Sequence, residues 1–120
     1  MYSLGAIVAA LKDGEVVAYP TEGVWGIGCD PSNEEALKKL ISLKKRSKAK
    51  GFILVGSELL HFKKYAEVEV NKTKLMSKWP GPHTWIVPAL QISPLLSGGK
   101  ETIALRLSEH KETVNICNEF

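Results

Sequence analysis

The chain has 120 residues, of which 44% are hydrophobic, so its length fits one small globular domain with a buried core. Its 16 basic and 13 acidic residues give a formal net charge of +3. This excess is too small for a dedicated nucleic-acid-binding arm, so an anion site would have to come from local clustering of basic residues.

The two cysteines and the first residues indicate the compartment. Cys29 and Cys117 have no neighbours at metal-ligand spacing, and two thiols in such a chain favour a reducing environment over a single disulfide. The apolar run GAIVAAL (5–11) is too short to span a bilayer, and no positive residue precedes it as in a secretory signal. We therefore expect a cytoplasmic protein without a membrane partner.

The first half of the chain predicts the order helix, strand, helix, strand. An apolar stripe predicts a first helix between Ser3 as cap and Gly14 as end; its members are Leu4, Ile7, Val8 and Leu11. EVVAY (15–19) predicts a buried strand that ends at Pro20. FILV (52–55) predicts a second buried strand, so we expect a βαβ unit or at least an α/β layer.

The helix between these strands has its own start and stop signals. Ser32 and Glu35 form a capping-box pattern at its start, and Lys44 and Lys45 complement the helix dipole in its last turn. Its predicted buried face consists of Ala36, Leu37, Leu40 and Ile41.

The second half predicts shorter elements. Short helical segments are predicted at 57–66 and around Leu75, Met76 and Trp79, with a loop or one helical turn at 94–99. TWIVPAL (84–90) predicts a strand that Pro88 places at a sheet edge. TIALRL (102–107) alternates cleanly as a strand with one apolar face. A last helix is predicted from residue 111, with Val114 and Cys117 on one face.

A glycine-rich stretch, AYPTEGVWGIGCDP (18–31), is the first candidate ligand loop. Gly23, Gly26 and Gly28 allow tight turns or close approach to a ligand, and Thr21 and Glu22 lie among them. Their order, G-x-x-G-x-G, differs from the dinucleotide fingerprint, and a Walker-type P-loop pattern is absent from the sequence. Two interpretations of the stretch therefore remain: an ordinary turn, and a loop that binds a ligand.

Basic residues supply the second candidate. Five of the seven residues from Lys44 to Lys50 are basic, which suits phosphate binding through charge-assisted hydrogen bonds. A solvated helix end whose lysines compensate the dipole is the alternative. Arg106 lies in mid-strand, opposite the apolar stripe, where it either faces solvent or directs its guanidinium at a carboxylate or phosphate.

Metal and acyl-enzyme chemistry have no support in the sequence. His61, His83 and His110 are scattered without a metal-binding pattern, and there is no G-x-S-x-G elbow. We therefore predict no catalytic nucleophile and no protein-held metal.

Four ordered blocks carry a family resemblance over nearly the whole chain. They are YPTEGVWGIGCDP (19–31), LKKRSKAKGFILV (43–55), WPGPHTWIVPA (79–89) and TIALRLSEH (102–110). In order and spacing they resemble the YrdC-like family, and within it the threonylcarbamoyl-AMP synthase branch. The resemblance implies an α/β fold with a twisted open sheet, flanking helices and a concave basic face, in a single domain over residues 1–120.

The resemblance also implies an activity. Such enzymes condense L-threonine, bicarbonate and ATP to threonylcarbamoyl-adenylate and pyrophosphate, for N6-threonylcarbamoyladenosine modification of tRNA. ATP would be a substrate that arrives with Mg²⁺, with no tightly bound cofactor, and tRNA and the downstream threonylcarbamoyl-transferase complex are further expected partners. The alternative is a tRNA or double-stranded-RNA-binding module without catalysis, whose binding would weaken steeply with salt.

Site residues follow from the matching positions. The resemblance implies that Lys44, Arg46 and Lys50 contact the ATP phosphates and that Thr84 lies on the nucleotide side. Thr21 and Arg106 would hold the threonine substrate, with Arg106 facing its carboxylate.

The chain also departs from the family pattern. Ser47 and Lys111 stand where the family often has proline. The family continues into a Ser-x-Asn block that completes the nucleotide site and has no match up to Phe120, so we expect the C-terminal part of the domain to be missing and the chain to be inactive alone. A hydrogenase-maturation carbamoyltransferase is a further rival, but that class carries cysteine-rich zinc motifs absent from this sequence.

Overall fold

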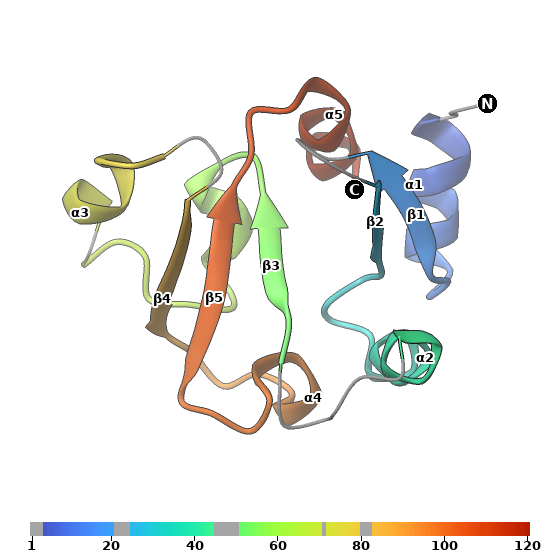
Figure 1. The fold of residues 1–120 in the computed structure, drawn as a ribbon, viewed down its shortest axis with the longest axis horizontal. Helices are drawn as coiled ribbons and strands as arrows, with labels where there is room; N and C mark the ends of the chain where they lie inside the picture. The colour runs from blue at the N-terminus through green and yellow to red at the C-terminus, as the bar shows by residue number, and fades with distance from the viewer. Residues whose placement is uncertain (1–3, 21–24, 45–50, 71, 80–82) are drawn as a thin grey trace.

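The computed structural model describes residues 4–20, 25–44, 51–70, 72–79 and 83–120. Its largest sheet has three strands, with β5 (Thr102–Leu107) between β3 (Ile53–Gly56) and β4 (Thr84–Pro88). β5 is parallel to β3 and antiparallel to β4, as Figure 1 shows. The predicted alternation of β5 is confirmed, and so is the edge position of the strand that ends at Pro88.

The described residues on either side of positions 21–24 in the glycine-rich stretch form a separate pair of strands, a hairpin; positions 21–24 themselves lie outside the described residues. β1 (Val17–Pro20) pairs in antiparallel fashion with β2 (Trp25–Gly28), so the second half of the glycine-rich stretch is a strand. Gly28 has a packing reason, because a Cβ at this position would lie 2.8 Å from Cε1 of the Tyr19 ring. Glycine here lets the aromatic ring lie across the neighbouring strand.

The pairing of these strands corrects two predictions. Among the described strands, β1 and β3 belong to different sheets, so the predicted βαβ unit is wrong, while the α/β layer is correct. The expectation that both strands are buried is correct only in part: Leu54 of β3 is buried, but Ala18 is exposed and Ile53 is 47% exposed. In β3, Leu54 is on the face of the sheet that packs into the core, while Ile53 is on the opposite face and lines the cleft.

The two long helices of the first half form where the periodicity predicts them. α1 (Leu4–Lys12) turns its apolar stripe inward, and α2 (Glu34–Lys44) buries all four predicted residues. The predicted Ser32 cap is wrong. Asn33 caps α2 instead, because its Oδ1 accepts the backbone N–H of Ala36 at 3.0 Å, while Ser32 bonds to Asp30.

Two of the helical segments predicted in the second half are shorter in the structure, whereas the single turn at 94–97 and the helix that begins at Lys111 are confirmed. The segment 57–66 contains one 3-10 turn, η1 (Leu59–Phe62), and α3 (Lys72–Met76) ends before Trp79. α4 (Pro94–Ser97) is a single turn with Ser93 as its cap. α5 (Lys111–Glu119) buries Thr113 and Ile116, so the predicted face of Val114 and Cys117 is off by one residue, because the packed side of a helix is set by its neighbours.

One face of the three-stranded sheet carries the main core. Leu54, Leu105 and Val87 on the strands pack there with Phe62 and Trp79, whose ring centroids are 5.5 Å apart. The opposite face is more open, since Ile53 and Ile86 are 47% and 71% exposed in the same row across the sheet. Arg106 lies on this second face, in the same row as Thr84 of β4 and Val55 of β3.

Candidate active-site cleft

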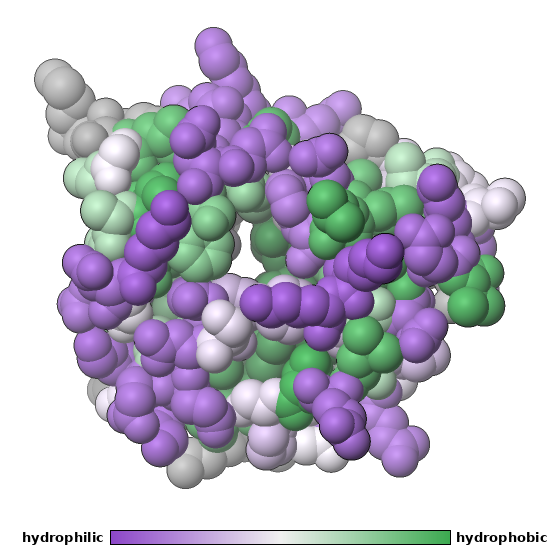
Figure 2. All heavy atoms as spheres, turned by 180° about the vertical axis from the view of Figure 1, so that it is seen from behind, coloured by the Kyte–Doolittle hydropathy of each residue, from purple (hydrophilic) through white to green (hydrophobic). Residues whose placement is uncertain are grey.

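A cleft of about 450 Å³ separates the hairpin from the three-stranded sheet. Val17, Ile27 and Leu40 line it from the hairpin and α2, and Ile53 and Ile116 line it from β3 and α5. Figure 2 shows the molecule from behind, hollowed near its centre, with hydrophobic side chains at the edge of the hollow. The volume lies within the range of about 300–1,000 Å³ that is usual for small-molecule sites.

Polar groups enter this apolar cleft from several of the neighbouring elements. Those that line it are Tyr19, Cys29, Lys44, His61, Tyr65, Arg106, Ser108, Thr113 and Cys117. An apolar cleft with few polar groups is the common form of a binding site for a small ligand.

Arg106 is the positive charge that the sheet contributes. It is half-buried, and its Nε–H and an Nη2–H donate to Oγ1 of Thr84 at 3.1 and 2.7 Å. Among the described residues, the ion pairs involve Lys38, Lys39 and His61, and none of them involves Arg106. A half-buried guanidinium whose described partner is a neutral hydroxyl is well suited to receive an anion.

Lys44 is the second cation of the cleft. It lies in the last turn of α2, is exposed, and lines the cleft together with Arg106. The structure therefore brings these two predicted residues to one cavity, from segments far apart in the sequence. Thr84 contacts Arg106 but does not itself line the cleft.

Three predicted site residues, Thr21, Arg46 and Lys50, lie outside the described residues. Most of the basic cluster at 44–50 lies there as well. The concave basic face therefore stays a prediction.

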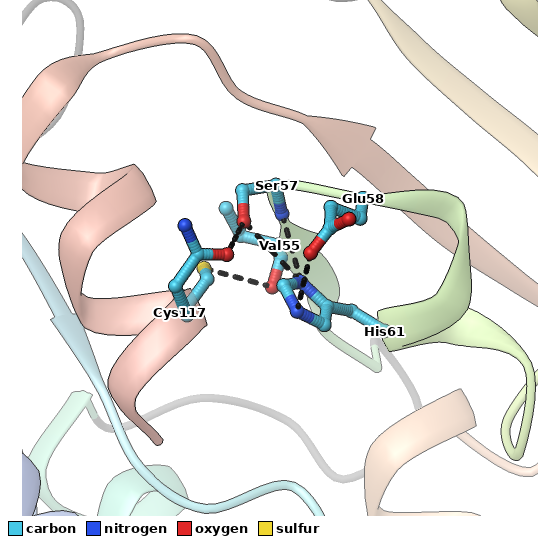
Figure 3. A network of polar contacts seen from close by, with 6 residues as sticks. Val55, Ser57, Glu58, His61 and Cys117 are labelled. Atoms are coloured by element: carbon cyan, nitrogen blue, oxygen red, sulfur yellow. Dashed lines mark hydrogen bonds and ion pairs between the residues drawn. The ribbon is translucent and has the colours of Figure 1, made fainter.

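A hydrogen-bond network closes the cleft where β3 meets η1 and α5 (Figure 3). The backbone N–H of Ser57 donates to Nδ1 of His61 at 3.1 Å, which leaves the proton of a neutral imidazole on Nε2. Nε2 lies 3.8 Å from the Glu58 carboxylate. The Ser57 hydroxyl donates to Oδ1 of Asn118 at 2.7 Å and so ties α5 to the end of β3.

Both cysteines of the cleft are held as neutral thiols. Burial, and secondarily the charge of Asp30, raises the pKa of the Cys29 thiol to about 11. Burial raises the pKa of the Cys117 thiol to about 11, and this thiol donates to the carbonyl of Val55. Neither cysteine is a thiolate at neutral pH, so neither is suited to act as a nucleophile.

Sequence patterns did not single out the serines at the strand ends. Ser57 and Ser108 directly follow β3 and β5, and the backbone N–H of Ser108 donates to the carbonyl of Gly56 at 2.9 Å. Because parallel strands end at the same sheet edge, polar residues directly after two apolar strands were an available signal. Tyr19, Tyr65 and His61 carried no comparable signal.

Two further observations concern metals and membranes. Within the described ranges, no group of three histidines, cysteines or acidic residues is placed to hold a metal ion. Across the same part of the chain, no helix is long and apolar enough to cross a membrane.

Comparison with known proteins identifies the family. The profile of the Sua5/YciO/YrdC family, described as "Telomere recombination", matches residues 9–120. The chain belongs to this family. Its mixed α/β fold with a twisted sheet and flanking helices is the fold of this family, which confirms that part of the predicted fold class.

Curated relatives in the family carry one name. The chain is 44% identical over 125 residues to a protein of Photobacterium profundum and 46% identical over 127 residues to one of Aliivibrio fischeri. Both are named threonylcarbamoyl-AMP synthase, and each alignment covers 100% of this chain and 68% of the relative. The chain thus spans about two thirds of the length of these relatives.

A solved structure has the same fold. Sua5 of P. abyssi, crystallised with L-threonine, superposes with a TM-score of 0.87 over 97% of this chain and 35% of its own chain. At 24% sequence identity, this match supports the fold.

Proposed function

We propose that the cleft between the hairpin and the sheet serves a threonylcarbamoyl-AMP synthase, which condenses L-threonine, bicarbonate and ATP to threonylcarbamoyl-adenylate and pyrophosphate. The observation that carries this proposal is Arg106, a half-buried cation lining an apolar cleft, with no acidic partner among the described residues. A ligand carboxylate bound in the cleft would supply the anionic partner of the Arg106 guanidinium. The names of the curated relatives point to the same reaction.

The reaction suits a site without a nucleophilic side chain. The amine of L-threonine and bicarbonate form a carbamate with loss of water. A carboxylate oxygen of the carbamate attacks the α-phosphorus of ATP, and pyrophosphate leaves. Catalysis then depends on aligning the partners and on neutralising the negative charge that develops on the phosphates. The neutral thiols of Cys29 and Cys117 agree with a reaction in which the protein forms no covalent intermediate.

Each proposed residue has one role. Lys44, Arg46 and Lys50 bind the ATP phosphates, and Thr21 and Arg106 hold L-threonine, with Arg106 facing its carboxylate. Mg²⁺ is proposed to arrive with ATP, bound to its phosphates, and we assign it no residue.

The proposed setting is the cytoplasm, where the product feeds the threonylcarbamoyl modification of tRNA. The tRNA and the downstream transferase complex are proposed partners on this basis. An RNA-binding module without catalysis would instead bind RNA with a steep salt dependence and would not respond to threonine.

The test is ATP–pyrophosphate exchange with and without L-threonine and bicarbonate. In a protein that also carries the Ser-x-Asn block, we expect threonine-dependent exchange and its loss in Arg46→Ala, because this arginine is proposed to neutralise the phosphates. Lys38→Ala is the control, since Lys38 is an exposed lysine paired with Glu35 and does not line the cleft. Unchanged exchange in Arg46→Ala, or exchange that does not depend on threonine in the wild-type form of that protein, would contradict the proposal.

A further inference from the structure

Thr84 and Arg106 form one unit across two strands. They are directly opposed in the antiparallel pairing of β4 and β5, and Val55 on β3 completes the same row. Directly opposed residues have Cβ atoms about 4.5–5.5 Å apart, which is near enough for side chains on one face to interact. The order of the row is Thr84, Arg106, Val55, and the last two line the cleft while Thr84 does not. Thr84 therefore lies on the β4 side of Arg106, away from the hairpin (Figure 1).

The hydrogen bonds determine which edge of the guanidinium is used. Nε–H and one Nη2–H form the side-on pair of donors, and both bond to Oγ1 of Thr84. An arginine has five N–H donors, so three are without a partner among the described residues, and they include one N–H from each Nη at the end of the group. This end-on pair is the set that a carboxylate can engage with two parallel bonds.

The same bonds limit what Thr84 can do. A hydroxyl oxygen has two acceptor lone pairs, and both are used by Arg106. Its own O–H remains a donor, but the Thr84 side chain is outside the cleft lining, so it acts on a ligand in the cleft through Arg106 rather than by contact.

We propose that Thr84 is a positioning residue: it holds the side-on edge of Arg106, so that the end-on edge is pre-organised for the carboxylate of L-threonine. The inference rests on the proposed function and changes the role of Thr84, which the family resemblance would place on the nucleotide side. Holding a long side chain in its binding geometry before the ligand arrives lowers the entropic cost of binding. The gain is specific to the ligand that Arg106 binds, so ATP binding does not share it.

Three variants test the inference. Thr84→Val keeps the β-branched shape and removes the acceptor, and Thr84→Ser restores the hydroxyl. Thr102→Val is the matched control, because Thr102 is on the same face of β5 but is exposed and outside the cleft lining. Binding of L-threonine and, separately, of ATP is measured by calorimetry, and the Nε–H signal of Arg106 is followed by NMR.

We expect Thr84→Val to weaken threonine binding roughly tenfold, to leave ATP binding unchanged, and to lose protection of the Arg106 Nε–H. Thr84→Ser and Thr102→Val should retain the wild-type values. A Thr84→Val protein with wild-type threonine affinity and a protected Nε–H would overturn the inference. Equal weakening of threonine and ATP binding would also overturn it, because that result indicates a direct nucleotide contact or a general loss of structure.

The two proposals fail in different ways. A wild-type chain that does not bind threonine would contradict the proposed function and the carboxylate role of Arg106 together. The NMR signal depends on the Thr84–Arg106 pair alone, so it separates that failure from a failure of the positioning role.

Discussion

Asn33 supplies the first side-chain hydrogen bond of α2. Its Oδ1 accepts the N–H of Ala36, one of the donors that the first turn of a helix leaves without a backbone partner. Ser32, one residue earlier, donates its hydroxyl and its backbone N–H to the Asp30 carboxylate. The two neighbours therefore have separate roles, one in the helix and one in the turn before it.

At this scale we predict unequal effects of two alanine substitutions. Asn33→Ala should lower the free energy of unfolding by about 1 kcal/mol, because the Ala36 N–H loses its partner. Ser32→Ala should cost less than about 0.5 kcal/mol, since it removes one exposed hydroxyl. Urea unfolding of the two variants measures both values, and an equal or larger loss for Ser32→Ala would assign the cap to Ser32.

Among the secondary-structure elements, β3 and η1 pack closely against each other at Gly56. Gly56 ends β3, and a Cβ there would lie 2.9 Å from Cζ of Phe62 and 3.0 Å from Cβ of His61. Phe62 is 0% exposed, so its ring has no free space into which to move. The absence of a side chain at Gly56 therefore allows the 3-10 turn to pack against the strand and brings His61 to the cleft.

We predict that Gly56→Ala destabilises the protein by about 1–3 kcal/mol through overpacking. Gly5→Ala, in α1, is the matched control because nothing lies within 4 Å of the added Cβ. It should be neutral or stabilise by up to about 1 kcal/mol, since alanine favours helix more than glycine does. Thermal unfolding distinguishes the two, and a neutral Gly56→Ala would show that the turn can shift without cost.

At the scale of the whole molecule, the cleft depends on contacts between distant segments. α5 follows β5 in sequence, and its Asn118 accepts the hydroxyl hydrogen bond of Ser57 at the end of β3, 61 residues away. This bond and the Ser57–His61 bond meet at one residue beside the cleft (Figure 3). We infer that they hold α5 in register with the sheet.

A double-mutant cycle tests this link. Ser57→Ala and Asn118→Ala should show a coupling of about 0.5–1 kcal/mol in unfolding free energy, the usual net value of one hydrogen bond. Ser57→Ala combined with Ser93→Ala is the control cycle, since Ser93 bonds to Glu34 and shares no partner with Ser57. Those two changes should add to within about 0.3 kcal/mol. If the changes in unfolding free energy caused by Ser57→Ala and Asn118→Ala were additive, the hydrogen bond between these two residues would not stabilise the protein.

The sequence by itself determined the features that depend on local order. The buried face of α2, the alternation of β5 and the edge position of Pro88 follow from periodicity and from the missing N–H of proline, which act within a few residues. The family blocks likewise placed Lys44 and Arg106, and both line the cleft.

Which strands pair and which side chains contact each other was decided by the tertiary structure alone. Local pattern could not show that β1 pairs with β2 rather than with β3, nor that Thr84 lies opposite Arg106, 22 residues away. These outcomes depend on strand register and on which surfaces pack together, and such long-range contacts leave no periodic signal in either segment. The side chains that line the cleft come from distant segments for the same reason, and packing brings them to one cavity.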